Sequence, residues 1–166
     1  MTKYGDPILE SVAGPFSDFD SVGGLSQKLR GFLTDQRIKW ITAKHLGVNA
    51  RMIVIEKALE DRLEFQTLIN PEIIKFHGPI VSRVEYDFSL PGLNVSVERR
   101  AEATIRFKDE NGEQHEKRFL GPACRLILQA IDQLDGKVMI INLNTHRRQS
   151  IKGYLRHLSK KLELQA

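Results

Sequence analysis

An apolar segment late in the chain, RLILQAIDQLDGK at residues 125–137, most strongly limits the folds that this sequence can adopt. Its apolar residues recur at the spacing of a buried helix face. Gly136 is typical of the position just after a helix C-terminus. The sequence therefore predicts a helix over residues 122–133 that the rest of the chain must enclose.

Strand patterns precede this helix. The continuous apolar centre of RMIVIEKA, residues 51–58, predicts a buried strand. The β-rich segment LEFQTLINPEIIKF, residues 63–76, is expected to break at Asn70, because a residue before proline avoids the helical region. Residues 93–121 alternate as two strands around the turn DENG, which predicts a hairpin.

Further elements are predicted near both ends. Helical spacing of apolar residues predicts a first helix over residues 24–36, and VMIINL at 138–143 predicts a short strand. Residues 145–164 predict a C-terminal amphipathic helix, whose apolar side carries Ile151, Leu155, Leu158 and Leu162. The predicted class is α+β, with antiparallel or mixed sheets around a central helix, in one domain over residues 1–166.

Composition and the absence of targeting patterns indicate the compartment in which this chain would fold. A chain of 166 residues with 41% hydrophobic and 28% charged residues is long enough to bury a core without a disulfide or a metal. The single cysteine, Cys124, excludes an internal disulfide framework and is expected to pack as a small hydrophobe. The sequence shows neither a signal-peptide pattern nor an apolar run of the roughly 18 residues that a membrane span needs. A cytoplasmic protein without a membrane partner is expected.

The positive charge is concentrated in the C-terminal segment. The net charge is +4, and four cations recur every fourth residue there: Arg148, Lys152, Arg156 and Lys160. Such a row predicts contact with an acidic partner, such as a phosphate backbone. The alternative is an ordinary solvated helix face.

The order of several motifs resembles the peptide deformylases, metal hydrolases that remove the formyl group from N-formylmethionyl nascent chains. The motifs are YGDPIL, LGVNARMIVIE, LINPEI, VEYDFSLPG, VERRAEATIRFKDENG and LILQAIDQLDGKVMIINL. Each is a weak signal alone, but their shared order and spacing extend over nearly the whole chain. The resemblance implies the deformylase fold and an iron or zinc centre.

The residues at the positions of that centre differ from the family pattern. Matching EYDFS to Glu-Gly-Cys-x-Ser places Asp87 where the family has a thiolate ligand. Matching QAIDQ to His-Glu-x-x-His places Gln129 and Gln133 at the two imidazole ligands and Ala130 at the general base. His45 stands where the family has a glutamine whose amide stabilises the oxyanion.

These differences predict a deformylase-like protein without metal and without catalysis. A neutral carboxamide is a weak ligand for iron or zinc, and Ala130 cannot accept a proton. The two glutamines are expected to hydrogen-bond each other or Asp87 in place of the metal. Two alternatives stay open: a rebuilt metal site that uses His45, Asp87 and the glutamine oxygens, and an active metal-dependent hydrolase of formylmethionyl peptides.

Other residues are assigned to a cleft: Trp40, Glu85, Phe88, Leu90 and Arg99. Trp40 replaces a glycine of the family pattern and is expected either to pack in the core or to fill the cleft, and Glu85 and Arg99 are expected to form a bracing ion pair. His45 is expected to be a surface or cleft histidine, and Asp87 has an alternative role as a turn residue. The cleft predicts a nascent-peptide partner that pairs with residues 38–42 and SLPG, and the basic C-terminal segment predicts a ribosomal one.

Overall fold

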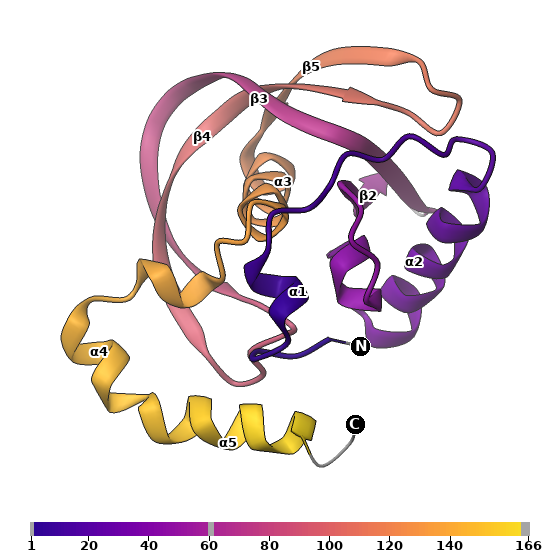
Figure 1. The fold of residues 1–166 in the computed structure, drawn as a ribbon. Helices are drawn as coiled ribbons and strands as arrows, with labels where there is room; N and C mark the ends of the chain where they lie inside the picture. The colour runs from indigo at the N-terminus through magenta and orange to yellow at the C-terminus, as the bar shows by residue number, and fades with distance from the viewer. Residues whose placement is uncertain (1, 60–61, 164–166) are drawn as a thin grey trace.

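One antiparallel sheet curves around a central helix (Figure 1). The computed structural model describes residues 2–59 and 62–163. Within these residues the sheet has five strands in the order of the sequence, and each strand pairs antiparallel with the next. The strands are β1 (Trp40–Thr42), β2 (Met52–Leu59), β3 (Arg62–Tyr86), β4 (Asn94–Lys108) and β5 (Gln114–Leu120).

The central helix is α3 (Gly121–Leu134), as the apolar pattern predicted. Pro122 lies in its first turn, where a missing N–H costs nothing, and its apolar face packs on β2, β4 and β5. Cys124 is completely buried in this core, as predicted, and burial raises the pKa of its thiol to about 11. The antiparallel sheet and central helix confirm the predicted α+β class.

The remaining helices lie around the sheet and α3. They are α1 (Pro7–Glu10), α2 (Val22–Gln36), the 3-10 helix η1 (Ala43–Leu46), the 3-10 helix η2 (Met139–Asn142), α4 (Thr145–Ser150) and α5 (Lys152–Glu163). The first predicted helix is confirmed as α2, which begins two residues earlier than expected. Among the described residues, no helix has the length and apolar character needed to cross a membrane.

The predicted break at Asn70 is wrong, because β3 continues through it as a single strand of 25 residues. Asn70 adopts a positive φ of 51°, and the register with β4 shifts between Ile69 and Glu72. Its side chain accepts from the Phe16 N–H and donates to the Phe16 carbonyl, both at 2.8 Å. The Asn-Pro step therefore marks a bulge, which bends a strand without ending it. The predicted hairpin is confirmed as β4 and β5.

Two predictions for the C-terminal segment are corrected. Residues 138–143 contain η2 instead of a strand, with i to i+3 hydrogen bonds from Ile141 to Val138 and from Leu143 to Ile140. The single helix predicted over residues 145–164 is two helices, separated at Ile151. Ile151, Leu155 and Leu158 pack against the core as predicted, whereas the Leu162 side chain and Leu164 lie outside what the structure describes.

Gly136 allows the chain to turn sharply after α3. Its φ is +74°, and a Cβ at this position would lie 2.5 Å from the carbonyl oxygen of Glu10. Gly136→Ala is therefore expected to lower the free energy of unfolding by about 2 kcal/mol, from left-handed strain and backbone crowding. Urea unfolding followed by circular dichroism measures this change.

Gly31→Ala is the matched control for that substitution. Gly31 is exposed in the middle of α2, and a Cβ there would meet nothing within 4 Å. Alanine should stabilise this position by about 0.5–1 kcal/mol, because it restricts the unfolded chain. Equal effects of the two substitutions would contradict the role given to Gly136.

Candidate functional site

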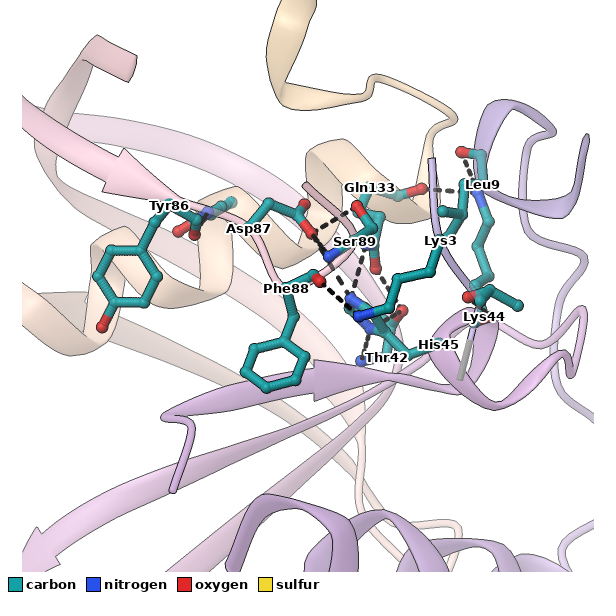
Figure 2. A network of polar contacts seen from close by, with 12 residues as sticks. Lys3, Leu9, Thr42, Lys44, His45, Tyr86, Asp87, Phe88, Ser89 and Gln133 are labelled. Atoms are coloured by element: carbon teal, nitrogen blue, oxygen red, sulfur yellow. Dashed lines mark hydrogen bonds and ion pairs between the residues drawn. The ribbon is translucent and has the colours of Figure 1, made fainter. Parts of the chain in front are cut away.

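A buried polar cluster joins three parts of the fold (Figure 2). His45 comes from η1, Asp87 follows β3, and Gln133 lies in the last turn of α3. Nε2 of His45 lies 2.9 Å from the amide nitrogen of Gln133 and 3.8 Å from Oδ1 of Asp87. Each of the three residues is at most 5% exposed. The structure thus brings together three residues that are distant in the sequence and were predicted to belong to one site.

His45 is held in one orientation by Thr42, the residue that precedes η1. The backbone N–H of Thr42 donates to Nδ1 of His45 at 3.1 Å. Nε2 of the ring then faces Gln133 and Asp87. The expectation of a surface or cleft histidine is wrong, because this hydrogen bond turns the ring into the interior, where it is 1% exposed.

Asp87 is a turn residue, as its alternative interpretation predicted. Its Oδ1 accepts from the Ser89 backbone N–H at 2.7 Å and from the Ser89 hydroxyl at 2.6 Å. Burial alone would raise the pKa of Asp87, but the nearby His45 ring and the hydrogen bonds from Ser89 outweigh it and hold this pKa below its ordinary value. The carboxylate is therefore ionised at neutral pH and its Oδ1 is occupied by donors.

The two glutamines of α3 point to different partners. The amide nitrogen of Gln129 donates to the Tyr86 carbonyl at 2.7 Å, while the amide of Gln133 contacts Thr42 and His45. Among the described residues, no hydrogen bond joins the two amides to each other or to Asp87, so that prediction is wrong. Both amides find nearer partners on the elements that flank α3. Ala130 between them is completely buried in the apolar core.

Lys44 is a polar residue of this region that sequence analysis missed. Its side chain is completely buried, and Nζ donates to the carbonyls of Leu9 at 3.0 Å, Ser11 at 2.6 Å and Gln133 at 2.7 Å. Burial lowers the pKa of Lys44 to about 8, with Asp135 opposing and Arg51 adding to this change. No local pattern signals its burial, because the three carbonyls belong to two segments distant in sequence. Lys44 thus ties η1 to the chain around α1 and to the end of α3.

The expected ion pair between Glu85 and Arg99 is present. Nε and Nη2 of Arg99 donate to the two carboxylate oxygens of Glu85 at 2.7 and 3.0 Å, and Nη1 donates to Asp132 on α3 at 2.7 Å. Arg125, which sequence analysis did not select, also donates to Glu85. These side chains join the end of β3 to β4 and to α3, so they brace the wall beside the polar cluster.

A cavity of about 860 Å³ lies next to this wall. It is bordered by residues 38–40, by residues 81–86 of β3 and by the first turn of α3. Of the predicted cleft residues, Trp40, Glu85 and Phe88 line it; Leu90 and Arg99 do not, and Leu90 is completely buried near α1.

The polar cluster is largely separated from this cavity. His45, Asp87 and Gln133 are not among the described residues that line it, whereas Gln129 is. The ring of Trp40 borders the cavity and makes an edge contact with the ring of His45, with 5.4 Å between centroids. Trp40 therefore stands between His45 and the space that a ligand could enter.

A second group of possible metal ligands lies at the turn between β4 and β5, far from the predicted site in sequence. Asp109, Glu113 and His115 bring ligand atoms within 4.8 Å of one another there. Asp109 already accepts from the backbone N–H groups of Asn111 and Glu113 and contacts the His115 ring. This arrangement is accounted for by the turn. A neighbouring cavity of about 600 Å³, beside Thr67 and Glu110, contains none of the predicted site residues.

Comparison with known proteins gives consistent similarities. The family model described as polypeptide deformylase matches residues 1–149. A protein of Brucella melitensis named peptide deformylase-like is 32% identical over 158 residues, which cover 93% of this chain and 94% of that protein. A peptide deformylase of Alkalilimnicola ehrlichii is 31% identical over 156 residues, covering 93% and 87%. A crystal structure of a peptide deformylase from Legionella pneumophila superimposes with a TM-score of 0.85 at 27% identity, covering 99% and 95%.

Proposed function

The chain belongs to the polypeptide deformylase family, and we propose that it is a member that has lost metal-dependent hydrolysis and retains a peptide-binding cleft. The observation that carries this proposal is the state of the residues at the expected metal-ligand positions. Asp87, Gln129 and Gln133 offer one carboxylate and two neutral amides, and each of them already has a hydrogen-bond partner within the protein.

This donor set does not fit the iron or zinc that the family resemblance implies. Amide oxygens are weak ligands for such ions, and one carboxylate does not replace a thiolate and two imidazoles. The amide oxygen of Gln133, the atom that would bind a metal, already accepts from the Thr42 hydroxyl. Ala130, at the position of the general base, is completely buried and has no group that accepts a proton.

The backbone around the cavity supports retained peptide binding. β1 pairs with β2 along one edge, and β3 beyond Ile69 pairs with β4 alone among the described residues. Both strands border the cavity, so each presents an edge there without a further strand among the described residues, and on β3 the Val81 and Tyr86 carbonyls accept from the side chains of Arg125 and Gln129. An extended peptide can hydrogen-bond to such an edge while its side chains enter the cavity.

Trp40 provides a direct test, because it is the only tryptophan of the chain and lines the cavity. Titration with formyl-Met-Ala-Ser is expected to change its fluorescence in a saturable way, while no formate is released above background. Release of formate at a rate that depends on the protein would contradict the proposal, and so would the absence of saturable binding.

We also propose that α5 contacts an acidic surface such as ribosomal RNA. Lys152, Arg156 and Lys160 are exposed at a spacing of four residues, while Leu155 and Leu158 face the core. The prediction that Arg148 belongs to this row of cations is wrong. Arg148 lies in α4, and its guanidinium donates to the carbonyls of Ile141 and Leu143.

Ribosome co-sedimentation tests this second proposal. The wild type is expected to pellet at low salt and to be released as salt rises, because phosphate contacts displace counterions. A variant with Lys152→Glu and Arg156→Glu should stay in the supernatant, whereas one with Lys28→Glu and Lys75→Glu, exposed cations elsewhere, should pellet as the wild type does. Equal pelleting of both variants would contradict this proposal and indicate that the cations of α5 form an ordinary solvated helix face.

A further inference from the structure

The side chains around the 860 Å³ cavity are strongly unbalanced in charge. Six cations line it against two carboxylates, Glu56 and Glu85. The cations are Lys39, Lys57, Arg83, Arg100, Lys117 and Arg125. An excess of positive charge at an opening lined by apolar side chains favours an anionic ligand, because the low-dielectric walls strengthen the field there.

Both carboxylates are already neutralised within the protein. Glu85 forms ion pairs with Arg99 and Arg125, and Glu56 forms one with Lys39. These contacts use Lys39 and Arg125, and Lys57 pairs with Glu64 outside the cavity lining, which leaves three of the six lining cations without a carboxylate in contact among the described residues. The positive charge at the cavity is therefore not cancelled locally.

The three remaining cations are exposed and come from three neighbouring strands. Arg83 lies on β3, Arg100 on β4 and Lys117 on β5. Arg100 donates to the Gly78 carbonyl, and Lys117 lies over the Phe119 ring at 5.2 Å. None of the three forms an ion pair with a residue that the structure describes. They are available to a ligand at the rim of the cavity.

The cavity also has an apolar lining. Trp40, Ile55, Phe119 and Leu126 contribute to it, and Trp40, Ile55 and Phe119 are each at most 7% exposed. In an extended peptide, successive side chains point in opposite directions. A strand laid along the edge of β1 or β3 would direct one set of side chains toward the apolar lining and the other toward the rim cations.

We propose that this cavity binds an extended peptide in which acidic and apolar side chains alternate. This inference rests on the proposed peptide-binding function and specifies the chemical class of the peptide. Charge complementarity selects the acidic side chains, and the two unpaired strand edges favour a peptide over other anionic amphiphiles.

Fluorescence anisotropy with two matched peptides tests the proposal. Labelled octapeptides of alternating Val and Glu and of alternating Val and Gln differ in charge and little in size. At low salt the acidic peptide is expected to bind at least tenfold more tightly than the neutral one, since several rim cations act together. The preference should decrease as salt rises, because exposed charges are screened.

A triple variant with Arg83→Gln, Arg100→Gln and Lys117→Gln is expected to reduce the preference to less than threefold. The control carries Lys28→Gln, Lys75→Gln and Lys152→Gln, which remove the same charge away from the cavity and should keep the preference. Thermal unfolding verifies that both variants are folded, since all six side chains are exposed.

The outcomes separate this inference from the proposed function. Equal binding of the two peptides by the wild type would overturn the acidic preference and leave peptide binding intact. Failure of both peptides to bind would overturn peptide binding as well. Displacement of the acidic peptide by dodecanoate at equal affinity would assign the cavity to anionic amphiphiles and overturn the peptide proposal.

Discussion

Replacing Lys44 with methionine is expected to lower the free energy of unfolding at pH 7 by about 3 kcal/mol, because buried carbonyls lose their donor. The carbonyls of Leu9 and Ser11 accept from Nζ and lie in the segment that closes over η1. Methionine fills a similar volume but donates no hydrogen bond. Chemical denaturation monitored by circular dichroism measures the loss.

Lys39→Met is the control, because Lys39 is more than half exposed and forms an exposed ion pair with Glu56. This variant should change the free energy of unfolding by less than about 1 kcal/mol, as exposed ion pairs contribute little. Comparable losses in the two variants would contradict the role assigned to Lys44.

The stability should also depend on pH in a way that identifies Lys44. Its pKa falls from an ordinary 10.5 to about 8 in the folded protein, mainly through burial. Between these values the unfolded chain binds more protons than the folded one, so stability rises with pH across this window. The difference between wild type and Lys44→Met should therefore grow from pH 8 toward pH 10, and a constant difference would contradict the burial of an ionisable amine.

Restoring the family residues is expected to produce metal binding without activity. The restored variant carries Asp87→Cys, Gln129→His, Ala130→Glu and Gln133→His, which supply the thiolate, both imidazoles and the base of the family pattern. We expect it to bind about one iron or zinc ion per chain and to leave formyl-Met-Ala-Ser intact, because Trp40 stands between the cluster and the cavity. Adding Trp40→Gly is expected to raise hydrolysis well above background.

A matched variant measures the contribution of the general base to the rate. Omitting Ala130→Glu from the five changes should leave metal binding unchanged and lower the rate by about 10²–10⁴-fold, the usual contribution of general-base catalysis. Thermal unfolding must accompany these assays, because Trp40 is 7% exposed and its removal opens the core. Rapid turnover by the restored variant with Trp40 intact would refute the blocking role of Trp40.

Local patterns were sufficient to predict the framework of the fold. The helix α3, the strand β2 and the hairpin of β4 and β5 follow from periodicity and turn residues that act over a few positions. The bulge at Asn70, the 3-10 helix η2 and the break at Ile151 depend on contacts between distant segments. A short apolar run such as VMIINL is compatible with a strand, and only its surroundings make it helical.

The candidate site was likewise predictable from the sequence only in part. Asp87, Gln129 and Gln133 could be selected because motif order placed them, and the pairing of Glu85 with Arg99 could be expected because both residues match the family pattern. The partners of the two amides, the burial of Lys44 and the contribution of Arg125 could not be predicted, since each is decided by which backbone group lies nearest in three dimensions.

Asp87, Gln129 and Gln133, at the family's ligand positions, are proposed not to hold a metal. Inductively coupled plasma mass spectrometry of protein purified without added metal is the sharpest test of this proposal. We expect far less than one iron, nickel or zinc ion per chain, and no rise in thermal stability when these ions are added. One tightly held ion per chain that is lost in the Asp87→Ala variant would contradict it.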